Sequence, residues 1–120
     1  MPAQNDALKE LLSKSSELNI TVTGRKSGRT ISLPIWFVLD GSELDLLPVK
    51  GSDTQWYKNV LQNPSIRVVA GSANAHLKAV PVTDAKHVKS IVEKFRAKYG
   101  AGDVKKYYSK LDVAVVAPLR

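Results

Sequence analysis

Apolar and polar residues alternate with two different periods along the chain, and these periods predict where strands and helices lie. Short apolar runs and two-residue alternation are typical of strands, whereas apolar residues three and four positions apart are typical of helices. The first pattern occurs in six segments, which we expect to form strands: 20–23, 30–39, 43–49, 65–70, 75–83 and 113–117.

Helical spacing marks the start of the chain, its middle and the region before the last strand. Leucines predict a short helix within 6–17, and a second short helix ends at Asn63-Pro64. The clearest helix is 84–99, and a shorter one follows it. We therefore expect one domain over residues 1–120, with two helical parts around the strands: an N-terminal helix (1–18) and a helical insert before the last strand (84–110).

The connections between the expected strands limit the possible folds. Most are too short for a parallel crossover, so the sheet should be mainly antiparallel. Pro34, Pro48 and Pro81 fall within strand-like runs. Because proline lacks the N–H that a sheet ladder needs, such positions belong at edges or bulges. Several of them suit a small curved barrel with bent strands. The pattern predicts a mainly β fold: a six-stranded, mostly antiparallel, closed or split β-barrel with flanking helices.

Charge points to anionic partners. The 120 residues include 18 Lys and Arg against 11 Asp and Glu, a net charge of +7. Segment 84–110 holds seven lysines and one arginine against three acids. A solvated helix face explains such a run most simply, and the alternatives are a polyglutamate cofactor tail, nucleic acid or peripheral contact with an acidic membrane surface. Aromatic residues are not interleaved with the cations along strands, which argues against nucleic acid.

Several kinds of site are excluded or disfavoured. The sequence contains no cysteine, which rules out disulfides and thiolate chemistry and favours a cytoplasmic protein. The N-terminus lacks the apolar core of a signal peptide, and no apolar run approaches the ~20 residues that span a bilayer. His76 and His87 have no companion at metal-ligand spacing, so we expect no metal site.

The sequence GRKSGR at 24–29 crowds three cations onto an expected hairpin turn. Its two glycines allow successive amide N–H groups to point inward at an anion. Arg25 and Lys26 can bind a phosphate, and Ser27 adds a hydroxyl donor. The pattern is neither a P-loop nor a Rossmann fingerprint, since no helix follows the loop. From these residues alone, a solvated hairpin and a phosphate site both remain open.

Three segments together resemble a known family. They are TVTGRKSGRTISLPIWFV (21–38), LLPVKGS (46–52) and QWYKNVLQNPSIRV (55–68). Their order and spacing are similar to those of the deazaflavin-dependent nitroreductase family, within the flavin/deazaflavin oxidoreductase superfamily that also includes pyridoxamine phosphate oxidase. The resemblance implies the FMN-binding split β-barrel fold.

The resemblance also implies a cofactor site, residue by residue. The phosphate of the cofactor would meet the turn, and the ring would lie against residues after Pro34 with the VKG loop at its polar edge. A tryptophan would lie over or beside the site, and an asparagine would brace the loop. The residues so implied are Arg25, Lys26, Ser27, Ile35, Trp36, Val49, Lys50, Gly51, Trp56 and Asn59. Family members often carry serine where Val49 stands, glycine where Ser52 stands and arginine where Ile31 stands.

For function, the resemblance implies a reductase that transfers hydride to a small organic acceptor. Its cofactor would be the deazaflavin coenzyme F-420, with FMN as the second candidate. The alternatives are an FMN-dependent oxidoreductase, or a non-catalytic protein that binds a flavin, a deazaflavin or haem. A homodimer is expected, because split barrels of this type commonly pair. Acid catalysis would come from bulk water or from a tyrosine, with Tyr107 and Tyr108 as the candidates nearest the expected substrate pocket. The alternative for these tyrosines, and for Trp36 and Trp56, is packing in the hydrophobic core.

Overall fold

The computed structural model describes residues 4–119, and the side chains of residues 7–119. It contains four α-helices, one 3-10 helix and eight strands in this part of the chain. In chain order they are α1 (Gln4–Ser13), β1 (Leu18–Thr23), β2 (Thr30–Ile35), β3 (Phe37–Asp40), β4 (Glu43–Leu46), η1 (Gly51–Asp53), α2 (Gln55–Gln62), β5 (Ser65–Ala70), β6 (Ala73–Lys78), β7 (Val80–Val82), α3 (Ala85–Tyr99), α4 (Ala101–Tyr107) and β8 (Ala114–Pro118).

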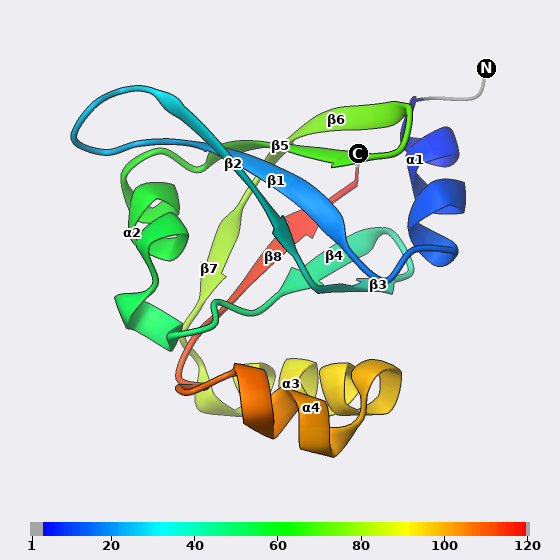
Figure 1. Ribbon diagram of the computed structural model, residues 1–120, viewed down its shortest axis with the longest axis vertical. Coiled ribbons are helices and arrows are strands. Elements are labelled where there is room, and N and C mark those ends of the chain that lie inside the picture. The colour runs from blue at the N-terminus through cyan, green and yellow to red at the C-terminus, as the bar shows by residue number, and fades with distance from the viewer. Residues whose placement is uncertain (1–3, 120) are drawn as a thin grey trace.

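The strands form two four-stranded antiparallel sheets, with the orders β2-β1-β5-β6 and β3-β4-β8-β7. Single residues separate β2 from β3 and β6 from β7, namely Trp36 and Ala79. Two long strands therefore bend from one sheet into the other, as Figure 1 shows. The mainly β, antiparallel split-barrel class is confirmed, and two of the six expected strands are each observed as two segments because of these bends.

The three prolines in strand-like runs have different outcomes. Pro34 lies in β2, an edge strand of the first sheet, and Pro81 lies in β7, an edge strand of the second. Both meet the expectation that a residue without an N–H occupies an edge. Pro48 lies outside any strand, because β4 ends at Leu46. The expected strand 43–49 therefore ends three residues early, where the chain turns toward η1.

Two hydrophobic cores hold the layers together. The first lies between the two sheets and includes Ile20, Phe37 and Leu44, with Leu8 of α1 and Val60 of α2 packed against it. The second lies on the outer side of the second sheet, which α3 and α4 cover (Figure 1). Since both faces of the second sheet are covered, all of Ala114–Ala117 in β8 are buried.

The outer face of the first sheet is different, because its outward side chains alternate with core residues and remain exposed or half-exposed. None of the helices in the described part of the chain has the length and apolar character needed to cross a membrane.

Candidate functional site

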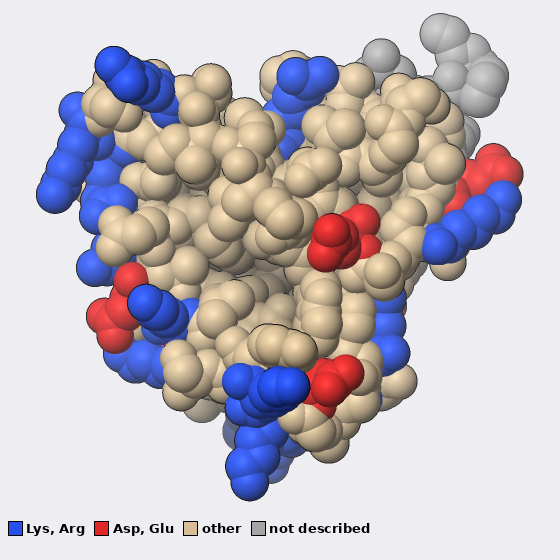
Figure 2. Space-filling model, in the orientation of Figure 1, with Lys and Arg blue, Asp and Glu red and all other residues tan. Residues whose placement is uncertain are grey.

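A pocket of about 520 Å³ opens between β2, the segment after β4, α2 and the end of α4. Figure 2 shows the hollow near the middle of this face, with cations gathered beside it over the β1–β2 hairpin. Its volume is within the ~300–1,000 Å³ typical of small-molecule sites. The lining residues are Glu17, Leu33, Pro34, Ile35, Trp36, Leu47, Val49, Lys50, Thr54, Trp56, Tyr107 and Tyr108.

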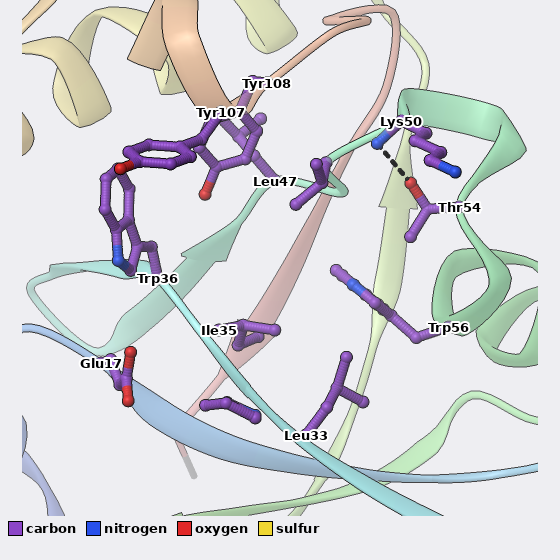
Figure 3. A pocket seen from close by; sticks show the side chains of 12 residues that line it. Glu17, Leu33, Ile35, Trp36, Leu47, Lys50, Thr54, Trp56, Tyr107 and Tyr108 are labelled. Atoms are coloured by element: carbon purple, nitrogen blue, oxygen red, sulfur yellow. Dashed lines mark hydrogen bonds between the residues drawn. The ribbon is translucent and has the colours of Figure 1, made fainter. Parts of the chain in front are cut away.

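Two tryptophans stand on opposite sides of the pocket (Figure 3). Trp36 occupies the bend between β2 and β3 and stacks on Tyr99, with ring centroids 4.2 Å apart and planes 6° from parallel. The Tyr107 ring meets Trp36 edge-on at 5.5 Å. Trp56 projects from α2 and is buried. Tyr99 of α3 and Tyr107 of α4 therefore hold the Trp36 wall of the pocket in place.

Charged groups lie at two places on the rim of this apolar pocket. Glu17 lies beside Trp36, and Lys50 lies across the pocket near Thr54 (Figure 3). The Lys50 backbone N–H donates a 2.7 Å hydrogen bond to Thr54 Oγ1, which fixes the backbone and leaves the ammonium exposed. The pocket can therefore hold a flat apolar body and offer a charge at each end.

The loop that carries Val49 and Lys50 is clamped from the C-terminal side. Asp112 accepts hydrogen bonds from the Ser52 N–H at 3.0 Å and from Ser52 Oγ at 2.6 Å. The Ser109 N–H donates to the Val49 carbonyl at 2.9 Å. Burial opposes the charge of Asp112, but the hydrogen bonds from Ser52 outweigh it and lower the pKa of this carboxyl. Segments 49–53 and 109–112 thus form one unit beside the pocket.

Gly51 makes this clamp possible. Its φ is +56°, which side chains rarely adopt, and an added Cβ would lie 2.0 Å from Asp112 Oδ1 and 2.9 Å from the Lys110 carbonyl oxygen. The glycine is therefore required both for the turn and for the close approach of the two segments.

The basic loop between β1 and β2 is fastened to α2. The Gly24 N–H donates to the Arg29 carbonyl at 2.8 Å, and the Gly28 N–H to the Gly24 carbonyl at 2.9 Å, which closes the turn. Arg25 donates to Asn59 Oδ1 from its backbone N–H at 3.1 Å and from Nη1 at 2.8 Å. Its Nη2 donates to Gln55 Oε1 at 2.8 Å. Lys26, Ser27 and Arg29 are exposed.

Asn59 contacts the basic loop through Arg25, and its role as a brace in a cofactor site stays a prediction. This contact also relates the loop to the pocket, because Gln55 and Asn59 hold Arg25 while Trp56, on the same helix, lines the pocket. Figure 1 shows the hairpin tip beside α2. The turn is therefore not a free hairpin, and its role as a phosphate site stays a prediction.

The expected site residues fall into two groups in space. The pocket brings together Ile35, Trp36, Val49, Lys50, Trp56, Tyr107 and Tyr108. The other five do not line it: Arg25, Lys26 and Ser27 lie on the loop, Asn59 lies beneath the loop, and Gly51 lies in the clamp.

The tyrosines differ in their surroundings. Tyr107 is 50% exposed at the pocket mouth, whereas Tyr108 is buried, and this burial raises the pKa of its hydroxyl. Tyr99 lies behind Trp36 and fixes it, because its Oη accepts from the Phe37 N–H at 3.1 Å and contacts the Ser16 carbonyl at 2.7 Å. Tyr57 is buried in the first core.

Some pocket residues were not expected from the sequence: Glu17, Leu33, Pro34, Leu47 and Thr54. Thr54 carried a signal, since Thr before a helix marks its N-terminus. Here the hydroxyl accepts from Lys50 and makes no cap hydrogen bond. Glu17 carried no signal, because it belongs to the connection between α1 and β1 and reaches the pocket only through the bend of the barrel.

Comparisons with known proteins support the fold and leave the activity open. The model of the family described as "Uncharacterized protein conserved in bacteria (DUF2255)" matches residues 8–116. A search of curated proteins finds no match.

Three solved structures illustrate the range of proteins with this fold. An F420-H2 dependent reductase, FDR-A, is 20% identical with a TM-score of 0.67, covering 85% of this chain and 93% of its own. A candidate pyridoxamine 5′-phosphate oxidase from Listeria innocua is 16% identical, with a TM-score of 0.71 and coverages of 98% and 95%. The haem storage protein HutZ from Vibrio cholerae is 13% identical, with a TM-score of 0.71 and coverages of 93% and 86%. The resemblance noted in the sequence is thus confirmed at the level of the fold.

Proposed function

Because the chain belongs to the DUF2255 family and has the split-barrel fold, we propose from its pocket and loop that it is a reductase that binds the deazaflavin coenzyme F-420. FMN is the second candidate cofactor. One observation carries the proposal. The pocket between Trp36 and Trp56 has the size of a ring, and α2, the helix that carries Trp56, also holds the basic glycine turn.

The pocket fits a flat heteroaromatic ring. Ile35, Trp36 and Trp56 supply apolar and aromatic walls, as such a ring requires. The backbone of Val49, Lys50 and Gly51 would meet the polar edge of the ring, and the clamp to Asp112 holds that backbone in place. Lys50 adds a cation that can approach a carbonyl or anionic ring oxygen.

The loop fits the phosphate of the cofactor. Two guanidinium nitrogens of Arg25 are held by Asn59 and Gln55, which leaves other N–H donors of the fork available for an anion. Lys26 and Ser27 are exposed and can add a charge and a hydroxyl donor. Because Arg25 is already ordered, its side chain loses little further entropy on binding.

The bound cofactor would supply hydride to a small organic acceptor. The protein's own residues would orient the ring and exclude water from one side of it. Tyr107 and Tyr108 are the proposed proton donors, since both line the pocket. Burial raises the pKa of Tyr108, so its Oη keeps a proton at neutral pH and can donate a hydrogen bond to an acceptor.

Storage of a flavin or of haem without turnover is the alternative. Its support is the fold shared with a haem storage protein. Neither histidine lines the pocket, so a haem iron there would have to take a tyrosine or a partner's residue as its ligand. We therefore rank haem below a flavin-type ring.

We also propose a homodimer in the cytoplasm. Contact of the Lys-rich insert with a membrane has less support, because two of its lysines already have structural partners. Lys94 bonds to Asp40 and Asp45, and Lys98 donates to the Phe37 carbonyl at 2.8 Å.

Titration with reduced coenzyme F-420 and with FMN, followed by tryptophan fluorescence, tests the proposal. We expect saturable binding of one cofactor. Arg25→Ala and Lys26→Ala should each weaken it by roughly 1–3 kcal/mol, because each removes a charged phosphate contact. Lys86→Ala, which removes an exposed charge from α3, serves as the matched control and should leave affinity unchanged.

Activity is measured separately, as reoxidation of the bound reduced cofactor by a panel of nitroaromatic and quinone acceptors. Binding without reoxidation would favour storage over a reductase. Unchanged affinity in both loop variants would show that the loop is not the phosphate site.

A further inference from the structure

The exposed face of the first sheet carries a second groove, of about 380 Å³, that shares no lining residue with the first pocket. Hydroxyl side chains, one arginine and one histidine dominate its lining: Thr21, Thr23, Ser32, Ser65, Arg67 and His76. These residues come from all four strands of the sheet, so its floor is a hydrogen-bonded ladder rather than a loop.

One row of side chains runs straight across this sheet. Ser32 of β2 pairs with Thr21 of β1, Thr21 pairs with Arg67 of β5, and Arg67 pairs with His76 of β6. Residues directly opposite in register point to the same face, about 5 Å apart. The hydroxyls of Thr21 and Ser32 lie 2.7 Å apart. The row therefore presents two hydroxyls, a guanidinium and an imidazole side by side.

This sheet is free of acidic residues. Its four strands, β1, β2, β5 and β6, contain no Asp or Glu, although the chain has 11. Arg67 makes no ion pair with the described residues, and its Nε donates only a long 3.4 Å hydrogen bond to Asn74 Oδ1. Elsewhere Lys94, Arg96 and Lys110 all have carboxylate partners. Arg67 thus lines the groove with no carboxylate of the sheet competing for its guanidinium.

The groove ends at the basic loop. Thr23 and Thr30, which are paired across β1 and β2, flank residues 24–29. Cations therefore lie both in the middle of the groove and at one end, and the four strands carry no Phe, Tyr or Trp on which a nucleic-acid base could stack.

We propose that this groove binds the phosphate of a small phosphorylated molecule. Arg67 can hold two phosphate oxygens with its guanidinium fork. Thr21 and Ser32 bond to each other, so one of their two hydroxyls can donate to a remaining oxygen, and a ring N–H of His76 can donate to another. The site is independent of the proposed reductase function, because it lies on other side chains and needs no ring pocket.

The test is a ¹H–¹⁵N NMR titration of the full chain with inorganic phosphate and with pyrophosphate, at constant ionic strength. We expect saturable shifts at the amides of Thr21, Arg67 and His76. Arg67→Gln should weaken binding about tenfold or more, because it removes a charge-assisted contact. Arg67→Lys should give an intermediate affinity, because it keeps the charge without the guanidinium fork. Lys86→Gln removes the same charge from α3 and should bind like the wild type. The spectra also report whether each variant is folded.

Four results would overturn the proposal. Shifts confined to 24–29 and abolished by Arg25→Ala would assign the phosphate to the basic loop instead. Equal losses of phosphate affinity in Arg67→Gln and Lys86→Gln would mean that binding depends only on the net charge of the protein. Shifts of the same amides with protein concentration alone would mean that a second copy covers the face. If a thymidine oligonucleotide binds at these amides more tightly than phosphate and pyrophosphate do, the ligand is a nucleic acid.

Discussion

Asp45 is a buried carboxylate whose removal should make the protein more stable at neutral pH. It lies in β4 under α3, is 0% exposed, and its Oδ1 has no hydrogen-bond partner. Its Oδ2 is 3.4 Å from Lys94 Nζ. Burial raises the pKa of this carboxyl from 3.8 to about 6, and the nearby carboxylate of Glu43 adds to the rise while Lys94 opposes it.

The size of the effect follows from this pKa. A rise of about two units corresponds to roughly 3 kcal/mol, since each unit is worth about 1.4 kcal/mol. Because the folded pKa is above the unfolded value, the folded state binds the extra proton between pH 3.8 and about 6. The free energy of unfolding therefore falls as pH rises through this interval, and the full cost of the charged carboxylate is present above pH 6.

Asp45→Asn removes the charge and keeps the shape. We expect its free energy of unfolding to exceed that of the wild type by about 1–3 kcal/mol at pH 8, less than the full amount because the amide also needs partners. The excess should shrink toward zero at pH 4. Lys94 keeps Asp40 as its partner in the variant. Urea unfolding of both proteins at intervals from pH 4 to pH 8 measures this difference.

Asp103→Asn, at an exposed position in α4, is the control and should show no such dependence on pH. If Asp45→Asn is less stable than the wild type at pH 8, the ion pair with Lys94 outweighs the cost of burial and the reasoning is wrong.

Two further predictions concern the pocket. Gly51→Ala should lower the free energy of unfolding by about 2–4 kcal/mol, because the new Cβ has no room against Asp112 and because φ at this residue is left-handed. Urea unfolding measures the loss. A loss below about 1 kcal/mol would mean that segments 49–53 and 109–112 separate easily. Val49→Ser should strengthen binding of the proposed cofactor by about 1 kcal/mol through a new hydroxyl donor. Val80→Ser is its control in the fluorescence titration, since both valines are 43% exposed, and an equal change in both would refute a specific contact.

The sequence predicted the strands well wherever one face of a strand is polar. Ser65–Ala70 was expected as a strand and is one, because exposed and buried residues alternate along it. Bent strands were expected, but the positions of the bends at Trp36 and Ala79 were not predicted. The strand-like pattern continues through each position, and periodicity reports which face is buried rather than the direction of the strand. The end of β4 at Leu46 was missed for the same reason, since Leu47 and Pro48 are also buried but pack outside the strand.

The sequence predicted the pocket residues that lie within short motifs better than those that tertiary packing brings to the pocket. Trp36, Lys50 and Trp56 belong to short segments whose spacing carries the resemblance, and all three line the pocket. Glu17 and Leu47 line it too, yet each reaches it by tertiary packing that no local pattern records. The stacking of Tyr99 on Trp36 joins residues 63 positions apart and depends on how α3 crosses the second sheet.

Helix α2 joins the basic loop to the wall of the pocket. Gln55 and Asn59 are four residues apart and hold Arg25, whereas Trp56 projects into the pocket from the first turn of the same helix. Helical geometry fixes the directions in which these side chains leave α2, so the Arg25 guanidinium is bonded to the same helix that carries the indole. We therefore propose that one ligand bridges them, a molecule with both a flat ring and an anionic tail, because it would meet two groups already in place.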